Sequence, residues 1–232
     1  YRSTNTPADA AFVNSDNYDD FDFILKKGVT SINGVDPKPG DRKLKDLSGD
    51  NVVNASDDKT IIGNCLPDFT YGIGNTFTWK GLSLYVFFDG VQGKDILNEF
   101  KYSTVSGGVA TYNNITRDAY YNAWRPENGS NKHARLINQS ACQESLSTYF
   151  VEDGSFIKLR TLTLSYNLPP KVCRPIHFEG LKLSFTVNNV YTWTKYTGLD
   201  PDITSSNPTF PGMDRMAYPT GRTYSFGIIA NF

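Results

Sequence analysis

The chain has 232 residues, a formal net charge of −1, a pI near 6.2 and a mean hydropathy of −0.41. The length allows one large domain, and the near-neutral charge argues against a nucleic-acid-binding protein, which normally carries a basic excess. No run of about 18 or more apolar residues is present, so no transmembrane helix is expected, although a barrel strand needs only ~9–11 residues with every second one apolar.

The first 64 residues are predicted to be mostly loop. Residues 1–19 lack a clear period, Phe21–Val29 is a candidate strand, and Asp36–Asn64 is rich in Gly, Asp, Asn, Lys and Pro. Such a composition is typical of a long structured loop.

Within this loop, residues 46–57 have the spacing of an EF-hand calcium loop. The predicted ligands are Asp46, Ser48, Asp50, the Val52 carbonyl and Asp57, at loop positions 1, 3, 5, 7 and 12. Position 6 is Asn51 where the EF-hand has Gly, position 12 is Asp where it has Glu, and no flanking helices are evident. We therefore expect either a structural Ca²⁺ site or a metal-free turn held by hydrogen bonds of Asp and Asn side chains.

The next segments alternate with a period of two, which predicts strands. Asp68–Trp79 and the run from Leu82 to Asp89 form a hairpin around Lys80-Gly81. Phe156–Leu168 alternates with a phase shift of one residue, which predicts a β-bulge near Arg160. The remaining strands are expected from Leu181 to Trp193 and from Thr223 to Phe232. No helical stripe of any length appears, so the chain is expected to be all-β.

The connections between these strands alternate in length. Lys80-Gly81 is short and residues 169–180 are moderate, whereas residues 92–148 and 194–221 are long. Outer-membrane barrels have short periplasmic turns and long extracellular loops. The alternation favours part of a large antiparallel transmembrane β-barrel, and the alternative is a soluble β-sandwich such as a carbohydrate-binding module.

The two architectures differ in where one apolar face points. In a barrel this face contacts lipid, and in a sandwich it forms the core. The face consists of Phe69, Tyr71, Ile73, Leu82, Leu84, Val86, Leu183, Phe185, Phe226 and Ile228.

Several stretches resemble the C-terminal region of SusC/RagA-type TonB-dependent outer-membrane transporters. They include KPGDRKLKDLSGDNVVNASDDKTIIGN from Lys38, LPDFTYGIGNTFTWKGLSLYVFFDGVQGKDILN from Leu66, AWRPENGSNKHARL from Ala123, YFVEDGSFIKLRTLTLSYNLP from Tyr149, NNVYTWTKYTGLDPD from Asn188 and YPTGRTYSFGIIANF from Tyr218. They cover nearly the whole chain, in the order that the family has.

This resemblance implies an outer-membrane location and a barrel of about 22 strands. Residues 1–232 would then be the C-terminal portion of the barrel, with the N-terminal plug and the other strands supplied by the rest of the same transporter. The resemblance also implies TonB, a SusD-like surface lipoprotein and surrounding lipid as partners. The implied cargo is oligosaccharide or, in some members, oligopeptide. The last residue, Phe232, follows alternating aromatic residues and resembles a barrel-assembly signal.

Four residues are candidates for contact with that cargo. Tyr85 and Asp89 lie on the predicted lumen-facing side of one strand, where they either line the cavity or pack against the plug. Trp124 and Arg125 lie in the longest loop, where they either stack on sugar rings or pack the loop onto itself.

No catalytic pattern is present. Neither GxSxG nor HExxH occurs, and paired carboxylates such as Asp57-Asp58 lie in a polar loop, so no enzymatic activity is expected. Of the three cysteines, Cys65 and Cys142 both fall on the predicted extracellular side and are expected to pair, whereas Cys173 lies in a periplasmic turn.

Overall fold

The computed structural model describes residues 30–105, 114–130, 132–136, 146–202 and 211–231. The chain divides into two compact units: residues 1–62 with 98–150 form the first, and residues 63–97 with 151–232 form the second. The strand predicted over Phe21–Val29 lies outside the described residues. In the described part of the chain, no helix is long and apolar enough to cross a membrane.

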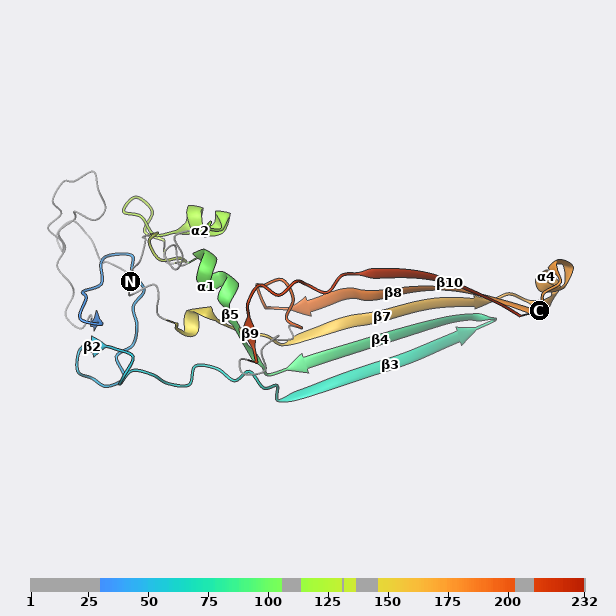
Figure 1. Ribbon diagram of the computed structural model, residues 1–232, viewed down its shortest axis with the longest axis horizontal. Coiled ribbons are helices and arrows are strands. Elements are labelled where there is room, and N and C mark those ends of the chain that lie inside the picture. The colour runs from blue at the N-terminus through green and yellow to red at the C-terminus, as the bar shows by residue number, and fades with distance from the viewer. Residues whose placement is uncertain (1–29, 106–113, 131, 137–145, 203–210, 232) are drawn as a thin grey trace. The chain divides into compact units, whose positions relative to one another are not determined.

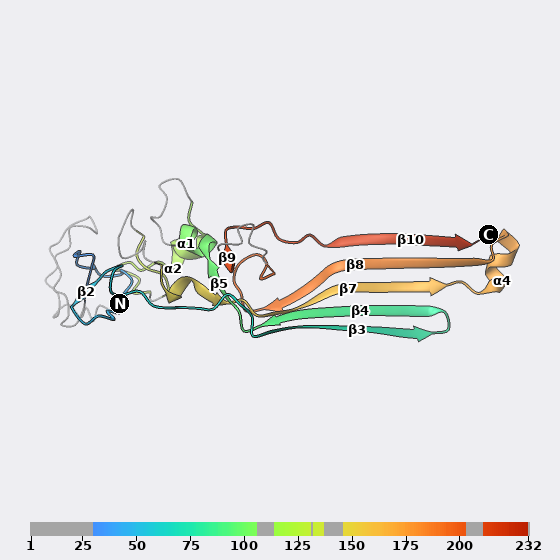
Figure 2. The ribbon, with the colours of Figure 1, turned by 60° about the horizontal axis from the view of Figure 1, so that its bottom comes forward.

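A five-stranded antiparallel sheet forms most of the second unit (Figure 1), in the order β10-β8-β7-β4-β3. Its strands are β3 (Phe69–Trp79), β4 (Leu82–Gln92), β7 (Phe156–Asn167), β8 (Gly180–Thr194) and β10 (Thr223–Asn231). They have 9 to 15 residues, whereas globular strands usually have about five or six. The five predicted strands are therefore confirmed, and Figure 2 shows them side by side along their length.

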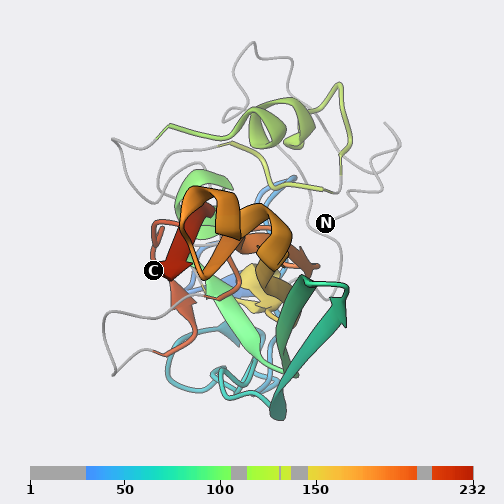
Figure 3. The ribbon, with the colours of Figure 1, turned by 90° about the vertical axis from the view of Figure 1, so that its right-hand side faces the viewer.

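The connections at the two ends of this sheet differ, as the sequence predicts. One end, called the turn end below, carries the β3–β4 turn and the segment between β7 and β8, which folds into α4 (Pro170–Cys173) and the 3-10 helix η3 (Arg174–Ile176). Figure 3 looks onto this end, with α4 nearest the viewer. The other end, called the loop end, carries the long connections from β4 to β7 and from β8 to β10. A small sheet in the order β6-β5-β9 is formed within those connections by Val151–Asp153, Asp95–Asn98 and Met213–Asp214.

The β3–β4 turn explains the glycine at position 81. Both turn residues have positive φ angles, 47° at Lys80 and 88° at Gly81, as the tight turn that matches the twist of two antiparallel strands requires. A Cβ atom at Gly81 would also lie 2.8 Å from the Asn167 carbonyl oxygen.

We therefore expect Gly81→Ala to lower the free energy of unfolding by about 1–3 kcal/mol, the usual cost of a strained backbone position. Lys80→Asn is the matched control, because asparagine tolerates positive φ. Urea unfolding of both variants in lipid measures the difference, and equal stability of the two would contradict the assigned turn.

The β-bulge predicted near Arg160 is confirmed. Leu159 pairs with Phe88 of β4 and Thr161 pairs with the adjacent Phe87, so that Arg160 is the extra residue. The register between β7 and β8 shifts at the same place, between Leu159 and Thr161. Because a bulge resets the phase of a strand, the apolar side chains on either side of Arg160 stay on one face of the sheet.

The first unit contains short elements that the sequence does not predict. Ser31–Ile32 (β1) and Val52–Val53 (β2) form a small parallel pair, with Leu44 packed against the buried Ile32 and Val53. The helices are α1 (Glu99–Val105), α2 (Arg117–Asn122) and the 3-10 helix η2 (Thr148–Phe150). The described part of the chain is mostly strands, as the all-β expectation has it, and these elements of three to seven residues are too short to produce a readable helical period.

Candidate functional site

The sheet of the second unit has one continuous apolar face. One row of register partners runs across all five strands and is apolar at every position: Phe77, Leu84, Leu164, Phe185 and Phe226. The next row, on the opposite face, is polar or small at every position: Thr78, Ser83, Ser165, Ser184 and Gly227. The ten side chains predicted to share a face all lie on the apolar one.

This apolar face is exposed and does not form a core. Phe77, Phe226 and Ile228 are 60%, 69% and 60% exposed. A sandwich would bury these side chains between two sheets, so the alternative of a soluble β-sandwich is wrong. A face of this size that is exposed over five strands is typical of a surface that contacts lipid.

Aromatic residues lie toward both ends of the apolar face, and Phe88 and Tyr224 lie between them. Phe69, Tyr71, Tyr191 and Trp193 lie toward the loop end, with ring centroids 5.9 Å apart in the Phe69–Tyr71 pair and 4.8 Å apart in the Tyr191–Trp193 pair. Phe77, Trp79 and Tyr166 lie toward the turn end, where the Lys80 ammonium is 5.0 Å from the Trp79 ring centroid. Eight positions along β3 separate Tyr71 from Trp79, or about 26 Å at ~3.3 Å per residue. Two aromatic belts about 25 Å apart bound the apolar band of an outer-membrane barrel.

On the opposite, polar face, two aromatic rings lie over glycines. A Cβ atom at Gly72 would lie 3.3 Å from the Phe87 ring, and one at Gly74 would lie 3.3 Å from the Tyr85 hydroxyl. The small residues of β3 thus leave room for the rings of β4 on the polar side. The predicted orientation of Tyr85 is confirmed, and its contact with cargo stays a prediction.

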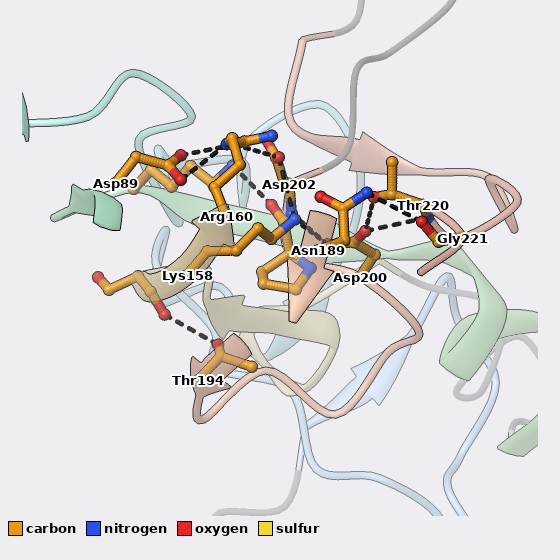
Figure 4. A network of polar contacts seen from close by, with 12 residues as sticks. Asp89, Lys158, Arg160, Asn189, Thr194, Asp200, Asp202, Thr220 and Gly221 are labelled. Atoms are coloured by element: carbon orange, nitrogen blue, oxygen red, sulfur yellow. Dashed lines mark hydrogen bonds and ion pairs between the residues drawn. The ribbon is translucent and has the colours of Figure 1, made fainter. Parts of the chain in front are cut away.

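A network of charged side chains lies on the polar face near the loop end (Figure 4). The Arg160 guanidinium donates to both carboxylate oxygens of Asp89, at 2.7 and 2.5 Å, and to Asp202 at 2.8 Å. The Lys158 ammonium lies 3.3 Å from Asp200 and 3.0 Å from Asp202. Lys158 is only 1% exposed, so its charge depends on these two carboxylates for compensation.

The carboxylate of Asp200 is held by further groups. It accepts hydrogen bonds from the Thr220 hydroxyl and backbone amide, and from the Asp202 amide at 3.0 Å. Burial alone would raise the pKa of the Asp200 carboxyl, but these hydrogen bonds and the Lys158 charge outweigh burial, so the net pKa is lowered. Asp200 is therefore ionised at neutral pH. Asp89, predicted to contact cargo, is paired with Arg160, and its contact with cargo stays a prediction.

In the first unit, Trp124 and Arg125 pack within their own loop. The Trp124 ring covers Gly40, where any Cβ atom would collide with it. The Arg125 guanidinium donates to the Tyr120 carbonyl at 3.0 Å and lies 4.9 Å from the Tyr120 ring centroid. These two residues belong to a different unit from Tyr85 and Asp89. Sugar contact by Trp124 and Arg125 stays a prediction.

The same unit holds polar contacts that the sequence does not reveal. The His133 ring nitrogens lie 2.7 Å from the Asp118 carboxylate and 2.7 Å from the Tyr149 hydroxyl. Hydrogen bonds from Lys132 and then His133 lower the pKa of the Asp118 carboxyl. His133, Tyr149 and Trp124 line a cleft of about 290 Å³. Since these residues are 9 to 25 positions apart in sequence and show no motif, no sequence signal would have found this cleft.

Two of the predicted calcium ligands accept hydrogen bonds from backbone amides of their own loop. Asp46 accepts the backbone amides of Gly49 and Asn51, at 2.6 and 2.9 Å, and Asp50 accepts that of Val52 at 2.8 Å. Among the described residues, no group of three or more His, Cys, Asp or Glu side chains is placed to hold a metal ion. This arrangement fits the turn held by Asp and Asn side chains better than a coordination shell.

Asp58 is not one of the predicted ligands, yet it makes several hydrogen bonds to the backbone of this loop. Its carboxylate accepts the amides of Leu47, Ser48 and Asn54 at 2.7, 3.0 and 2.8 Å. Hydrogen bonds from Asn54, Leu47 and Ser48 lower the pKa of the Asp58 carboxyl below its usual 3.8. The ionised form thus stabilises the loop above pH ~4, and the stabilisation is lost as the pH falls through the lowered pKa.

We expect Asp58→Ala to speed amide exchange in residues 46–58 at neutral pH, whereas Asp57→Ala leaves it nearly unchanged. In wild type the same amides should lose protection below pH ~4. Hydrogen exchange with mass spectrometry measures both effects. A larger effect of Asp57→Ala would instead support the calcium loop.

Calcium binding by Asp46, Ser48, Asp50, Val52 and Asp57 stays a prediction with its own test. If the ion binds and draws these groups together, adding millimolar Ca²⁺ should slow exchange in residues 46–57 and Mg²⁺ should not, because Mg²⁺ demands a smaller octahedral shell. Unchanged exchange in both salts would reject the site. Cys142 lies outside the described residues, so its predicted pairing with Cys65 also stays a prediction.

Comparisons with known proteins find similar outer-membrane receptors. No protein-family model matches the chain. It is 31% identical over 89% of its length to TonB-dependent receptor P3 of Formosa agariphila, covering 20% of that protein. It is 24% identical over 90% of its length to TonB-dependent receptor SusC of Bacteroides thetaiotaomicron, covering 19% of it. The chain therefore spans about a fifth of the length of the curated relatives it matches.

Two solved structures are also similar. The RagAB peptide importer in its open-open state matches 77% of this chain and 18% of that chain, with a TM-score of 0.64 and 28% identity. Its closed-closed state matches 89% of this chain and 20% of that chain, with a TM-score of 0.65 and 25% identity.

Proposed function

Because this chain belongs to the SusC/RagA-type TonB-dependent receptors of the outer membrane, we propose that it forms part of the wall of a nutrient importer. The apolar face contacts the lipid, and the polar face lines the transport path or packs against the plug. The full-length receptor imports oligosaccharides or oligopeptides in a TonB-dependent manner.

The observation that carries this proposal is the alternation of the two faces across five strands. The row through Leu84 is apolar at every position from β3 to β10, and the row through Ser83 is polar or small at every position. In a barrel wall every strand must present apolar side chains outward and polar ones inward. A barrel wall also needs neighbours, since the outer edges of β3 and β10 carry unpaired backbone groups that lipid does not tolerate. We infer that other strands of the same polypeptide pair with both edges.

The proposed partners are a SusD-like lipoprotein and TonB, as the family implies. The long connections lie together at the loop end, where a SusD-like lipoprotein would cover the extracellular mouth, while TonB acts on the periplasmic side through the plug. A structural relative is the RagAB peptide importer, which supports peptide cargo, while the resemblance to the SusC/RagA family leaves oligosaccharide cargo equally open.

A growth experiment tests the function and separates the cargo classes. Deletion of the gene for the full-length receptor should abolish growth on its cargo as the limiting nutrient, and complementation should restore growth only in cells that have TonB. Defined oligosaccharides and defined oligopeptides form the two arms. Growth that is unchanged in both arms would reject import of either class, and growth without TonB would reject the energy source.

A further inference from the structure

The charge network does more than neutralise a buried lysine, because it joins the sheet to a segment of the connection between β8 and β10. Asp200 and Asp202 come from this segment, whereas Asp89, Lys158 and Arg160 come from β4 and β7. We infer that Lys158 and Arg160 are positioning residues, which hold Gly198–Asp202 over the loop end of the polar face as an ionic clasp. This inference rests on the proposed function in one respect, namely that the polar face borders the transport path.

The bulge places the cations Lys158 and Arg160 where both can reach Asp202. Lys158 pairs in register with Asp89 of β4 and with Thr192 of β8. Arg160, the extra residue, points to the same side and reaches both Asp89 and Asp202. Asp202 contacts both Lys158 and Arg160, so it links the two cations of β7.

The segment is anchored at other points as well. Tyr196 is buried, and its hydroxyl donates to Asp214 at 2.6 Å. Pro201 is buried, and its carbonyl accepts from the Lys94 ammonium at 2.7 Å. The segment thus lies in a defined place over the sheet, and Lys158 is covered by it.

The consequence concerns cargo selection. Lys94, Lys158 and Arg160 face Asp89, Asp200 and Asp202, so three cations and three carboxylates compensate one another. Leu199 of the clasp is 65% exposed. With the clasp closed, cargo at this level meets Leu199 and the paired charges of Arg160 and Asp202, and it does not meet Lys158. Loss of the clasp would expose Lys158 and leave Arg160 without Asp202.

Thiol labelling tests the clasp in the purified full-length receptor in detergent micelles. Cys65, Cys142 and Cys173 are replaced by serine, and Thr192→Cys supplies one thiol on the polar face beside Lys158. Thr192 lines a cleft of about 210 Å³ together with Asp200 and Pro201. Thr76→Cys, on the polar face of β3 and away from the clasp, is the control position.

Asp200→Asn with Asp202→Asn should raise the labelling rate at position 192 by about tenfold or more with a polyethylene-glycol maleimide, as a shift of 1.4 kcal/mol in an opening equilibrium gives. Labelling at position 76 should not change. Asp202→Asn alone should give a smaller rise, and Asp202→Glu should restore the slow rate, because it restores the charge.

Equal rates at position 192 in all variants would overturn the clasp, and a parallel rise at position 76 would show general loosening and overturn it too. A fast rate in Asp202→Glu would show that charge is not the cause. Because labelling requires no transport, failure of TonB-dependent growth would reject the proposed function without changing this result.

Discussion

Replacing Leu162 with arginine is expected to lower the free energy of unfolding in a lipid bilayer by about 2–4 kcal/mol, the cost of arginine on the lipid face near the bilayer midplane. Leu162 lies on the apolar face of the central strand β7, between Val86 and Val187 in register. Its row crosses β3 at Asn75, midway between Tyr71 and Trp79.

The matched control is Ser165→Arg in the same strand but on the polar face. It should change stability by no more than about 0.5 kcal/mol, as a substitution outside a packed or lipid-facing position does. Urea unfolding of the full-length receptor in phospholipid vesicles gives both values. If Ser165→Arg cost more than Leu162→Arg, the two faces would be assigned the wrong way round.

Lys158→Ala is expected to cost about 3–5 kcal/mol, because removal of one partner from a buried ion pair leaves the others uncompensated. Lys158 is almost fully buried, and two carboxylates lie within 3.3 Å of its ammonium. The loss would come mainly from the buried Asp200, because Asp202 keeps its ion pair with Arg160.

Lys182→Ala is the control for this substitution. Lys182 lies on β8 and is exposed, so its removal should change stability by no more than about 0.5 kcal/mol. The same unfolding measurement compares the two lysines. A cost below about 1 kcal/mol at Lys158, the range of exposed pairs, would mean that water reaches its ammonium.

The sheet was predictable because each strand carries its own evidence. A period of two over nine or more residues predicts which side chains share a face of the sheet. The phase shift around Arg160 predicts the position of the bulge. The turn at Lys80-Gly81 was readable for the same reason, because the residue types required at positive φ are few. The long loops then gave the direction of the strands, since the two classes of connection lie at opposite ends.

The charge network was only half predictable. Alternation places Lys158 on the polar face, but its partners Asp200 and Asp202 are more than 40 positions away, and sequence gives no distance between them. A Lys and an Arg on the polar side of one strand, together with the Asp-Pro-Asp of residues 200–202, are the signal that was available. Only the fold of the connection after β8 brings the two groups into contact.

The loop around Asp46 shows that spacing alone does not identify every residue that holds a loop. Alternating oxygen side chains from Asp46 to Asp57 have the spacing of a calcium loop, yet Asp58 collects three backbone amides. Asp57 and Asp58 are adjacent and identical in type, so the choice between them depends on backbone direction, which spacing does not report. Helix α2 was also not predictable. Its N-terminus is capped because the Ala119 amide donates to the Thr116 hydroxyl at 3.1 Å, but a single capping residue in a polar loop is too weak a signal to predict a helix.

The central claim is that the apolar face of the five-stranded sheet contacts lipid, and spin labels along β7 test it most directly. Single nitroxide labels at positions 162 to 166 of the full-length receptor, reconstituted in vesicles, are measured for collision with oxygen, which concentrates in lipid, and with a water-soluble nickel chelate. Positions 162, 164 and 166 should show high oxygen and low nickel accessibility, and positions 163 and 165 should not show high oxygen accessibility. High oxygen accessibility at 163 and 165, or the absence of any period of two, would contradict the assignment of this sheet to a membrane wall.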